Sequence, residues 1–225
     1  MRDTWREINL FLSRYLSPAV RAILVANVII FLLYALLGRF RPFTIFFFLL
    51  WESPRLAVGH LFLWQFVTYM FMHAGPAHLF FNMLVLWFFA PRLEYRWGTA
   101  RFLRFYFVVG IGAGVFHALF AYLTHNADSS MMGASGAIYG VMLAYAIYYP
   151  DETVLFYFVL PIKIKYLMII LGVITFFASI PGDAQGGISH VTHLGGLVVA
   201  FLYLQIGNWL SSREGRRGSG RRFDL

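Results

Sequence analysis

Cysteine is absent from this chain of 225 residues, which excludes disulfide bonds, thiolate metal sites and a cysteine nucleophile. Charge is also scarce, because Asp, Glu, Lys and Arg make up only 12% of the residues, whereas 60% are hydrophobic and 20% are aromatic. A soluble domain of this size carries about 25% charged residues to cover its surface. The composition therefore predicts an integral membrane protein whose chemistry depends on Ser, His, Asn, Tyr or carboxylates.

Long stretches without Asp, Glu, Lys or Arg divide the chain into candidate spans. Since a spanning helix needs about 20 mostly apolar residues, we predict an all-α bundle of six transmembrane helices. The stretches are residues 22–38, 56–91, 105–127, 129–150, 166–182 and 184–212.

Two of the spans have limits that the charge pattern does not set. The second stretch is too long for one helix, so its span is expected to begin near Pro76, where proline is tolerated in a first turn. Residues 39–75 then form a long first loop, too apolar for water and expected in the membrane interface. An apolar run at 153–162 leaves the start of the fifth span open.

Basic residues orient the bundle, because short loops rich in Lys and Arg stay cytoplasmic. Fifteen of the 18 Lys and Arg residues lie before the first span, in the second-to-third and fourth-to-fifth connections, or after the sixth span. Both termini are therefore expected inside, giving a cytoplasmic lead at 1–20, a core at 21–210 and a basic tail at 211–225. The net charge of +8 follows from this asymmetry and from attraction to anionic lipid, so no nucleic-acid partner is predicted.

Polar side chains occur in the first turns of the three spans that enter from the outside. Polar groups at membrane depth are costly and mark function, so we expect a water-accessible site near the outer surface. Residues four apart share a helix face, which pairs the groups of the second span and those of the fourth span. The side chains are His78 and Asn82, Ser135 and Tyr139, and His190 and His193.

A serine opposite a histidine indicates a nucleophile and its base, provided that their side chains come within about 2.6 to 3.2 Å. His193 can be the base for Ser135, and His78, Asn82 and the Ser135 backbone N–H can stabilise an oxyanion. None of the six stretches contains a carboxylate, so we predict a Ser-His dyad with Tyr139 packed under the imidazole.

Small residues favour close contact between the fourth and sixth spans. Gly136 and Gly140 lie four apart on one, and Gly196 and Ala200 lie four apart on the other. Such pairs let helix backbones approach closely, which is what brings the serine and the histidine within reach.

These motifs together resemble the rhomboid family of intramembrane serine proteases over about residues 20 to 210. They are His73 and His78 to Asn82, Glu94-Tyr95-Arg96-Trp97-Gly98, Gly133-Ala134-Ser135-Gly136 with Tyr139, and His193-Leu194-Gly195-Gly196. The resemblance implies Ser135 as nucleophile, His193 as general base, and an oxyanion site of His78, Asn82 and the Ser135 amide. Tyr139, Gly133, Gly136 and Gly196 take supporting roles, and neither cofactor nor metal is implied.

The resemblance also implies a substrate and a place in the cell. Single-spanning membrane proteins would be cut near the extracytoplasmic end of their transmembrane segment, through an acyl-enzyme, with a gate for lateral entry near the fifth span. The expected partners are such substrates and the lipid bilayer. We expect a prokaryotic plasma membrane with the active site on its extracytoplasmic side.

Other interpretations remain open beside this one. A rhomboid-like pseudoprotease or a small transporter would use the same helices without hydrolysis, although we detect no repeat between the halves of the chain. His190 and His193 resemble half of a metal site, but no carboxylate or cysteine accompanies them. His73 is interpreted as a loop or water-network residue, and His60, His117 and His125 as interfacial or packing residues.

Overall fold

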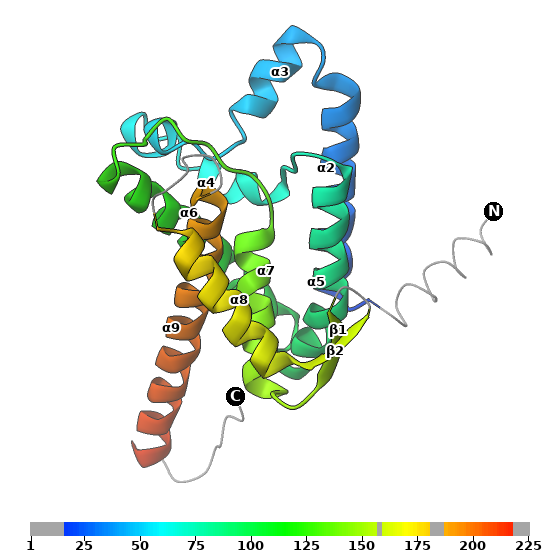
Figure 1. Ribbon diagram of the computed structural model, residues 1–225, viewed down its shortest axis with the longest axis vertical. Coiled ribbons are helices and arrows are strands. Elements are labelled where there is room, and N and C mark those ends of the chain that lie inside the picture. The colour runs from blue at the N-terminus through cyan, green and yellow to red at the C-terminus, as the bar shows by residue number, and fades with distance from the viewer. Residues whose placement is uncertain (1–15, 157–158, 181–186, 218–225) are drawn as a thin grey trace, which may run out of the picture.

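The computed structural model describes residues 16–156, 159–180 and 187–217, and helices dominate it (Figure 1). The predicted lead at 1–20 lies mostly outside these residues, as does the end of the predicted tail at 211–225. The long helices are α2 (Pro18–Leu37), α5 (Pro76–Trp97), α6 (Thr99–Leu123) and α9 (Gly187–Arg217). Two shorter apolar helices are α7 (Ser135–Tyr148) and α8 (Ile164–Ala178).

The helices confirm a predominantly α-helical membrane protein. By length and composition, α2, α6 and the part of α9 at His190–Gly207 can each cross a membrane. A fourth candidate joins Gln65–Phe71 to α5 through a bend of 96°. Helix α7 has 14 residues and α8 has 15, which at about 1.5 Å per residue is shorter than a hydrocarbon core of about 30 Å. The count of six spans therefore stays a prediction.

The first loop is folded onto the bundle. It contains α3 (Arg41–Phe48), the π-helical turn η1 (Arg55–Gly59), the short helix α4 (Gln65–Thr68) and the 3₁₀ turn η2 (Tyr69–Phe71). The fully buried Gln65 donates to the Leu49 carbonyl at 3.1 Å and accepts from the Ser53 N–H at 3.2 Å. These bonds hold two parts of the loop together, and the Tyr69 hydroxyl joins the loop to α6 by donating to the Gly110 carbonyl at 2.6 Å.

Helix α5 begins at Pro76, as its sequence predicts, and Glu94 near its other end anchors α2. The Glu94 carboxylate accepts from the backbone N–H groups of Ala19 and Val20 and from the hydroxyls of Ser17 and Thr99. The first N–H groups of a helix lack partners within it and carry partial positive charge. The Glu94 carboxylate therefore both accepts hydrogen bonds from the first N–H groups of α2 and offsets their positive charge.

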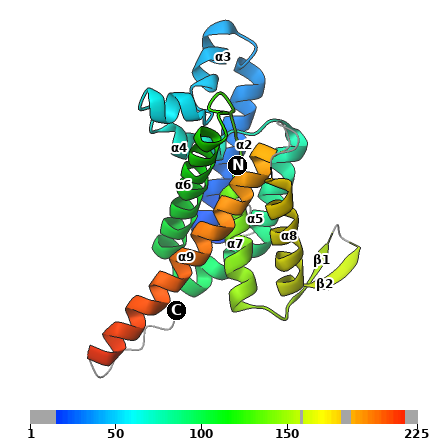
Figure 2. The ribbon, with the colours of Figure 1, turned by 60° about the vertical axis from the view of Figure 1, so that its left-hand side comes forward.

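The apolar run before α8 forms a hairpin, which the sequence did not indicate. Strands β1 (Thr153–Phe156) and β2 (Leu160–Lys163) pair antiparallel, with Val154 opposite Ile162. The hairpin projects from the helices (Figure 2). At its base Asp151 accepts from Lys165 at 2.7 Å and from Lys163 at 3.0 Å, and these hydrogen bonds hold the pKa of Asp151 below its usual range.

Helix α7 packs against α5, α6, α8 and α9, and small residues form its contacts with α9. A Cβ added at Gly196 would lie 2.0 Å from the carbonyl oxygen of Gly136, and one added at Gly140 would lie 3.0 Å from the Cβ of Ala200. The backbones of α7 and α9 therefore touch, at the two small-residue pairs that the sequence indicates.

Candidate active site

Ser135 and His193 come together across the contact between α7 and α9. Ser135 is the first residue of α7, and its Oγ lies 2.8 Å from Nε2 of His193. Both residues are partly buried. Gly136 and Gly196 lie beside them, so the close approach of the two backbones is what sets this distance. The separation matches that of a nucleophile and its general base.

Tyr139 orients the imidazole of His193. The two rings are stacked, with centroids 4.2 Å apart and planes inclined by 8°. The buried Nδ1 of His193 has no hydrogen-bond partner among the described residues, so none of their carboxylates orients the ring from that side. Stacking on Tyr139 and the bond to Ser135 fix the ring instead.

Gly133 sets the backbone conformation of the loop before Ser135. Its φ of +124° lies in the region that L side chains rarely adopt, and a Cβ there would lie 2.8 Å from Cε1 of His78. The N–H of Gly133 donates to the Tyr69 carbonyl at 2.9 Å. This conformation packs the loop against His78 and leads directly into α7. The N–H of Ser135, in the first turn of α7, has no acceptor within the helix.

Asn82 lies one turn after His78 and is buried. Its side-chain nitrogen donates to the His78 carbonyl at 2.8 Å, so this amide is engaged with its own helix. Nδ1 of His78 accepts from the N–H of Ala74 at 3.4 Å, and the fully buried His73 packs edge-on against His78 with centroids 5.1 Å apart. His78 therefore borders the loop before Ser135, whereas an oxyanion role for Asn82 stays a prediction.

His190 lies beside His193, with ring centroids 6.1 Å apart and planes inclined by 86°. Within the described ranges, no three His, Asp or Glu side chains gather as they would around a metal ion. The predicted pair of histidines thus has no third ligand in that part of the chain.

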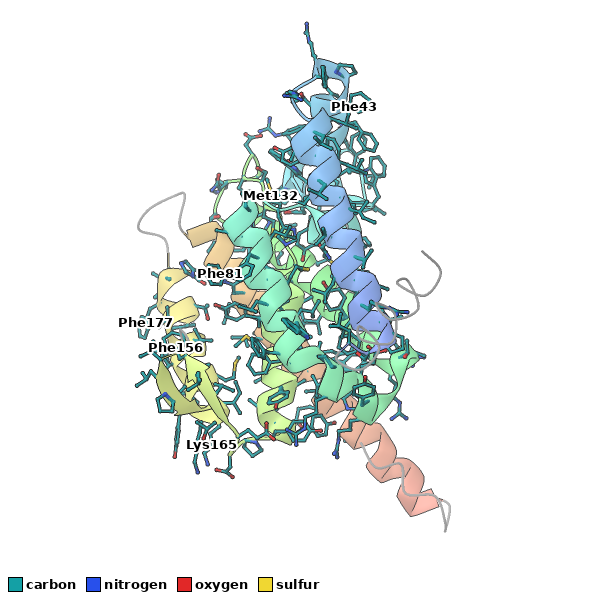
Figure 3. The ribbon with its side chains drawn as sticks, turned by 90° about the vertical axis from the view of Figure 1, so that its right-hand side faces the viewer. Phe43, Phe81, Met132, Phe156, Lys165 and Phe177 are labelled. Atoms are coloured by element: carbon teal, nitrogen blue, oxygen red, sulfur yellow. The ribbon has the colours of Figure 1, made fainter. Side chains whose placement is uncertain are left out.

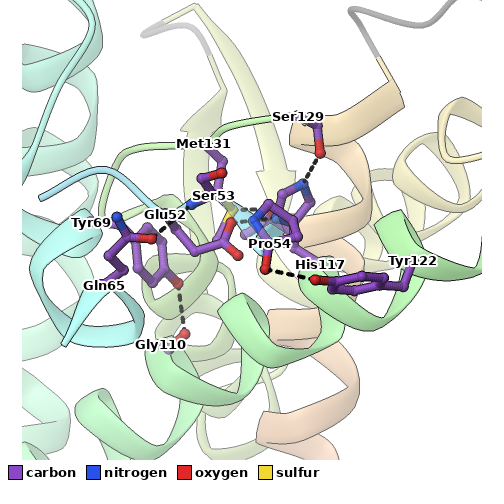
Figure 4. Close-up of polar contacts among 11 residues, drawn as sticks. Glu52, Ser53, Pro54, Gln65, Tyr69, Gly110, His117, Tyr122, Ser129 and Met131 are labelled. Atoms are coloured by element: carbon purple, nitrogen blue, oxygen red, sulfur yellow. Dashed lines mark hydrogen bonds and ion pairs between the residues drawn. The ribbon is translucent and has the colours of Figure 1, made fainter. Parts of the chain in front are cut away.

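The structure contains a second polar cluster, of Glu52, His117 and Ser129, which the sequence analysis did not predict. His117 was expected to be an interfacial or packing residue, but it is buried in α6 and its Nδ1 lies 2.5 Å from Oε2 of Glu52 (Figure 4). The Ser129 hydroxyl lies 3.3 Å from the other ring nitrogen. One signal was available: Glu52 is the only acidic residue between Glu7 and Glu94, and an isolated carboxylate in apolar sequence needs a partner.

These features define a class, an integral membrane protein of packed helices that holds a serine hydroxyl against an imidazole. The chain belongs to the rhomboid family, since the Rhomboid domain model matches residues 60–209.

Individual relatives agree with the family match. The chain is 40% identical over 82 residues to the protein YdcA of Bacillus subtilis, covering 36% of this chain and 39% of that protein. It is 30% identical over 151 residues to rhomboid protease GluP of the same organism, covering 67% of this chain and 27% of GluP. It is 25% identical over 214 residues to the chloroplastic rhomboid-like protein 16 of Arabidopsis thaliana, covering 89% of this chain and 64% of that protein. The chain thus spans less than two thirds of each of these relatives.

Proposed function

We propose that the protein is an intramembrane serine protease that works by a dyad of Ser135 and His193. The observation that carries the proposal is the distance of 2.8 Å between Oγ of Ser135 and Nε2 of His193. Membership of the rhomboid family supports it, because GluP, one of the matched relatives, is named as a protease.

The reaction follows from the positions of these groups. As Oγ of Ser135 attacks the peptide carbonyl carbon, its proton passes to Nε2 of His193. The oxyanion is stabilised by the Ser135 N–H, the His78 side chain and Asn82. The C–N bond then breaks, His193 returns the proton to the leaving amine, and an acyl-enzyme remains. Water, deprotonated by His193, attacks that ester and releases the second product with Ser135 restored.

The proposed substrate is the transmembrane segment of a single-spanning membrane protein, cut near its extracytoplasmic end. Phe81 of α5 is 52% exposed and Phe177 of α8 is 65% exposed, on the face of the molecule shown in Figure 3. Helix α8 packs on α7 and α9, so lateral entry between α5 and α8 would disturb few contacts. A helical peptide bond is shielded by its own hydrogen bonds, so the substrate must unwind locally before attack.

The proposed setting is a prokaryotic plasma membrane, crossed six times, with both termini cytoplasmic and Ser135 toward the outside. The distribution of Lys and Arg supports this orientation. The matched relatives include bacterial and chloroplast proteins, and both kinds of membrane suit a chain of this composition. The lipid bilayer is the second partner, and we propose no nucleic-acid partner.

Labelling with a fluorescent fluorophosphonate tests the dyad, alongside cleavage of a transmembrane peptide in detergent. We expect Ser135→Ala and His193→Ala each to lose about 10³-fold or more in both readouts, because removing either member of such a pair disables it. Ser179→Ala is the matched control, since its hydroxyl donates to the Thr175 carbonyl of α8, and it should stay within about twofold of wild type.

Two results would contradict the proposal. Undiminished cleavage by Ser135→Ala would remove the nucleophile from the mechanism. A folded wild-type protein that is neither labelled nor able to cut the peptide would favour a rhomboid-like pseudoprotease that binds membrane helices without hydrolysis.

A further inference from the structure

Glu52, His117 and Ser129 join three separate segments of the chain. Glu52 belongs to the first loop, His117 to α6, and Ser129 to the connection between α6 and α7. The imidazole lies between the other two side chains, 2.5 Å from the carboxylate and 3.3 Å from the hydroxyl (Figure 4). All three residues are buried, with exposed fractions of 0%, 1% and 8%.

Backbone hydrogen bonds extend this junction along the same two segments. The N–H of Glu52 donates to the Met131 carbonyl at 3.1 Å, and the N–H of Met131 donates to the Glu52 carbonyl at 2.9 Å. The N–H of Arg55 donates to the Ala127 carbonyl at 3.1 Å. The segment from Glu52 to Arg55 therefore lies antiparallel to the segment from Ala127 to Met131.

The second of these segments leads directly to the reacting side chains. Ser129 precedes Ser135 by six residues, and the Met131 sulfur accepts from the hydroxyl of Thr192, which immediately precedes His193, at 2.8 Å. Residues 129–133 thus lead into Ser135 along the chain and contact the residue before His193 through Met131. A shift of this segment would move the serine, its N–H and the base relative to one another.

The carboxylate gives the junction a defined geometry. Burial raises the pKa of Glu52, and the facing imidazole of His117 opposes that shift. A buried carboxylate and a buried imidazole are each costly alone, so replacing one destabilises the arrangement that the other requires. The contact between Glu52 and His117 therefore favours a single arrangement of the segments that carry them.

The three side chains also have the connectivity of a Ser-His-acid triad, with the acid on one ring nitrogen and the serine on the other. Their burial argues against a second nucleophile, because a peptide carbonyl needs access to the serine oxygen. The same burial suits a contact that holds chain segments in place.

We propose that Glu52 and His117 are positioning residues for Ser135. Through Ser129 and the bonds to Met131, they hold the backbone that presents the nucleophile and its N–H to the substrate. This inference rests on the proposed protease function for its kinetic readout, but its structural readout is independent of activity.

The kinetic test compares Glu52→Leu with Glu94→Leu, which removes a buried carboxylate at the opposite end of α5 from His78. We expect the rate of fluorophosphonate labelling of Ser135, per folded molecule, to fall about 10- to 100-fold in Glu52→Leu, because small misplacements of reacting groups are costly. The loss should appear in kcat with KM nearly unchanged. Glu52→Gln, which keeps an acceptor for His117, should recover most of the rate.

Arg55→Gln is a second control, because the ion pair of Arg55 with Asp128 joins the same two segments but is exposed. It should leave the labelling rate within about twofold, since exposed ion pairs contribute little. An unchanged rate in Glu52→Leu, or an equal loss in Glu94→Leu, would overturn the inference. Labelling of Ser129 in the Ser135→Ala protein would overturn it in favour of a second nucleophile.

Amide hydrogen exchange of the peptide covering residues 129–136 separates this inference from the proposed function. Faster exchange in Glu52→Leu but not in Glu94→Leu supports the positioning role, even if the wild-type protein cleaves nothing. Unchanged exchange in Glu52→Leu would overturn the role, even if the protein is an active protease.

Discussion

Gly133 is the residue at which backbone conformation and candidate chemistry meet most directly. Gly133→Ala places a side chain at a φ of +124° and a Cβ 2.8 Å from the His78 ring, at a strain of about 1 to 3 kcal/mol. We expect labelling of Ser135 to fall about 10²-fold while the protein stays folded. Gly75→Ala is the control, because its Cβ would meet nothing within 4 Å. Similar labelling rates in the two variants would show that the conformation of Gly133 is dispensable.

At the scale of single residues, the sequence predicted those candidate site residues that belong to a recognisable motif. Ser135 and His193 could be paired because each lies within three residues of a glycine, on spans that the charge pattern predicts to enter from the same side. Glu52 and His117 could not, because their contact depends on how residues 39–75 fold, and no periodicity or charge pattern encodes that path. The stretches that define the predicted spans contain no carboxylate, yet the Glu52 carboxylate reaches α6 from the loop.

The contact between α7 and α9 is the element-scale feature on which the candidate site depends. Gly196→Ala puts a Cβ 2.0 Å from the Gly136 carbonyl oxygen, so the helices must separate. We expect a loss of about 1 to 3 kcal/mol in the free energy of unfolding, typical of overpacking, together with loss of Ser135 labelling. Gly207→Ala lies on the same helix with no atom within 4 Å of its Cβ, and should be neutral or stabilising by up to about 1 kcal/mol. Thermal unfolding in detergent would measure both, and equal stability would contradict the close contact.

The charge-free stretches predicted the positions of the helices better than their lengths. The start of α5 at Pro76 was predictable because proline suits a first helical turn. The hairpin at 153–163 was not, because short apolar runs fit a strand, a helix or an interfacial segment equally well. Helix α7 has only 14 residues and begins at Ser135, because residues 129–134 of the predicted stretch form the loop that carries Gly133.

For the whole molecule, the distribution of basic residues predicts which ends of the helices face the cytoplasm. The cysteine-free chain allows a direct test, since a single introduced thiol has no background. On intact cells we expect Thr124→Cys, beyond the end of α6, to react with a membrane-impermeant maleimide. Val159→Cys, which lies in the hairpin and is 81% exposed, should react only after lysis. The opposite result would invert the proposed orientation.

Met131 makes the candidate site sensitive to oxidation, although the chain contains no cysteine. Its sulfur is held by the hydroxyl of Thr192 at 2.8 Å, and the residue is only 7% exposed. Oxidation to the sulfoxide would add an oxygen to a packed contact between the segment before Ser135 and the residue before His193. Peroxide would thereby act on the site through packing alone, leaving the serine and the imidazole chemically intact, and methionine sulfoxide reduction would reverse the effect.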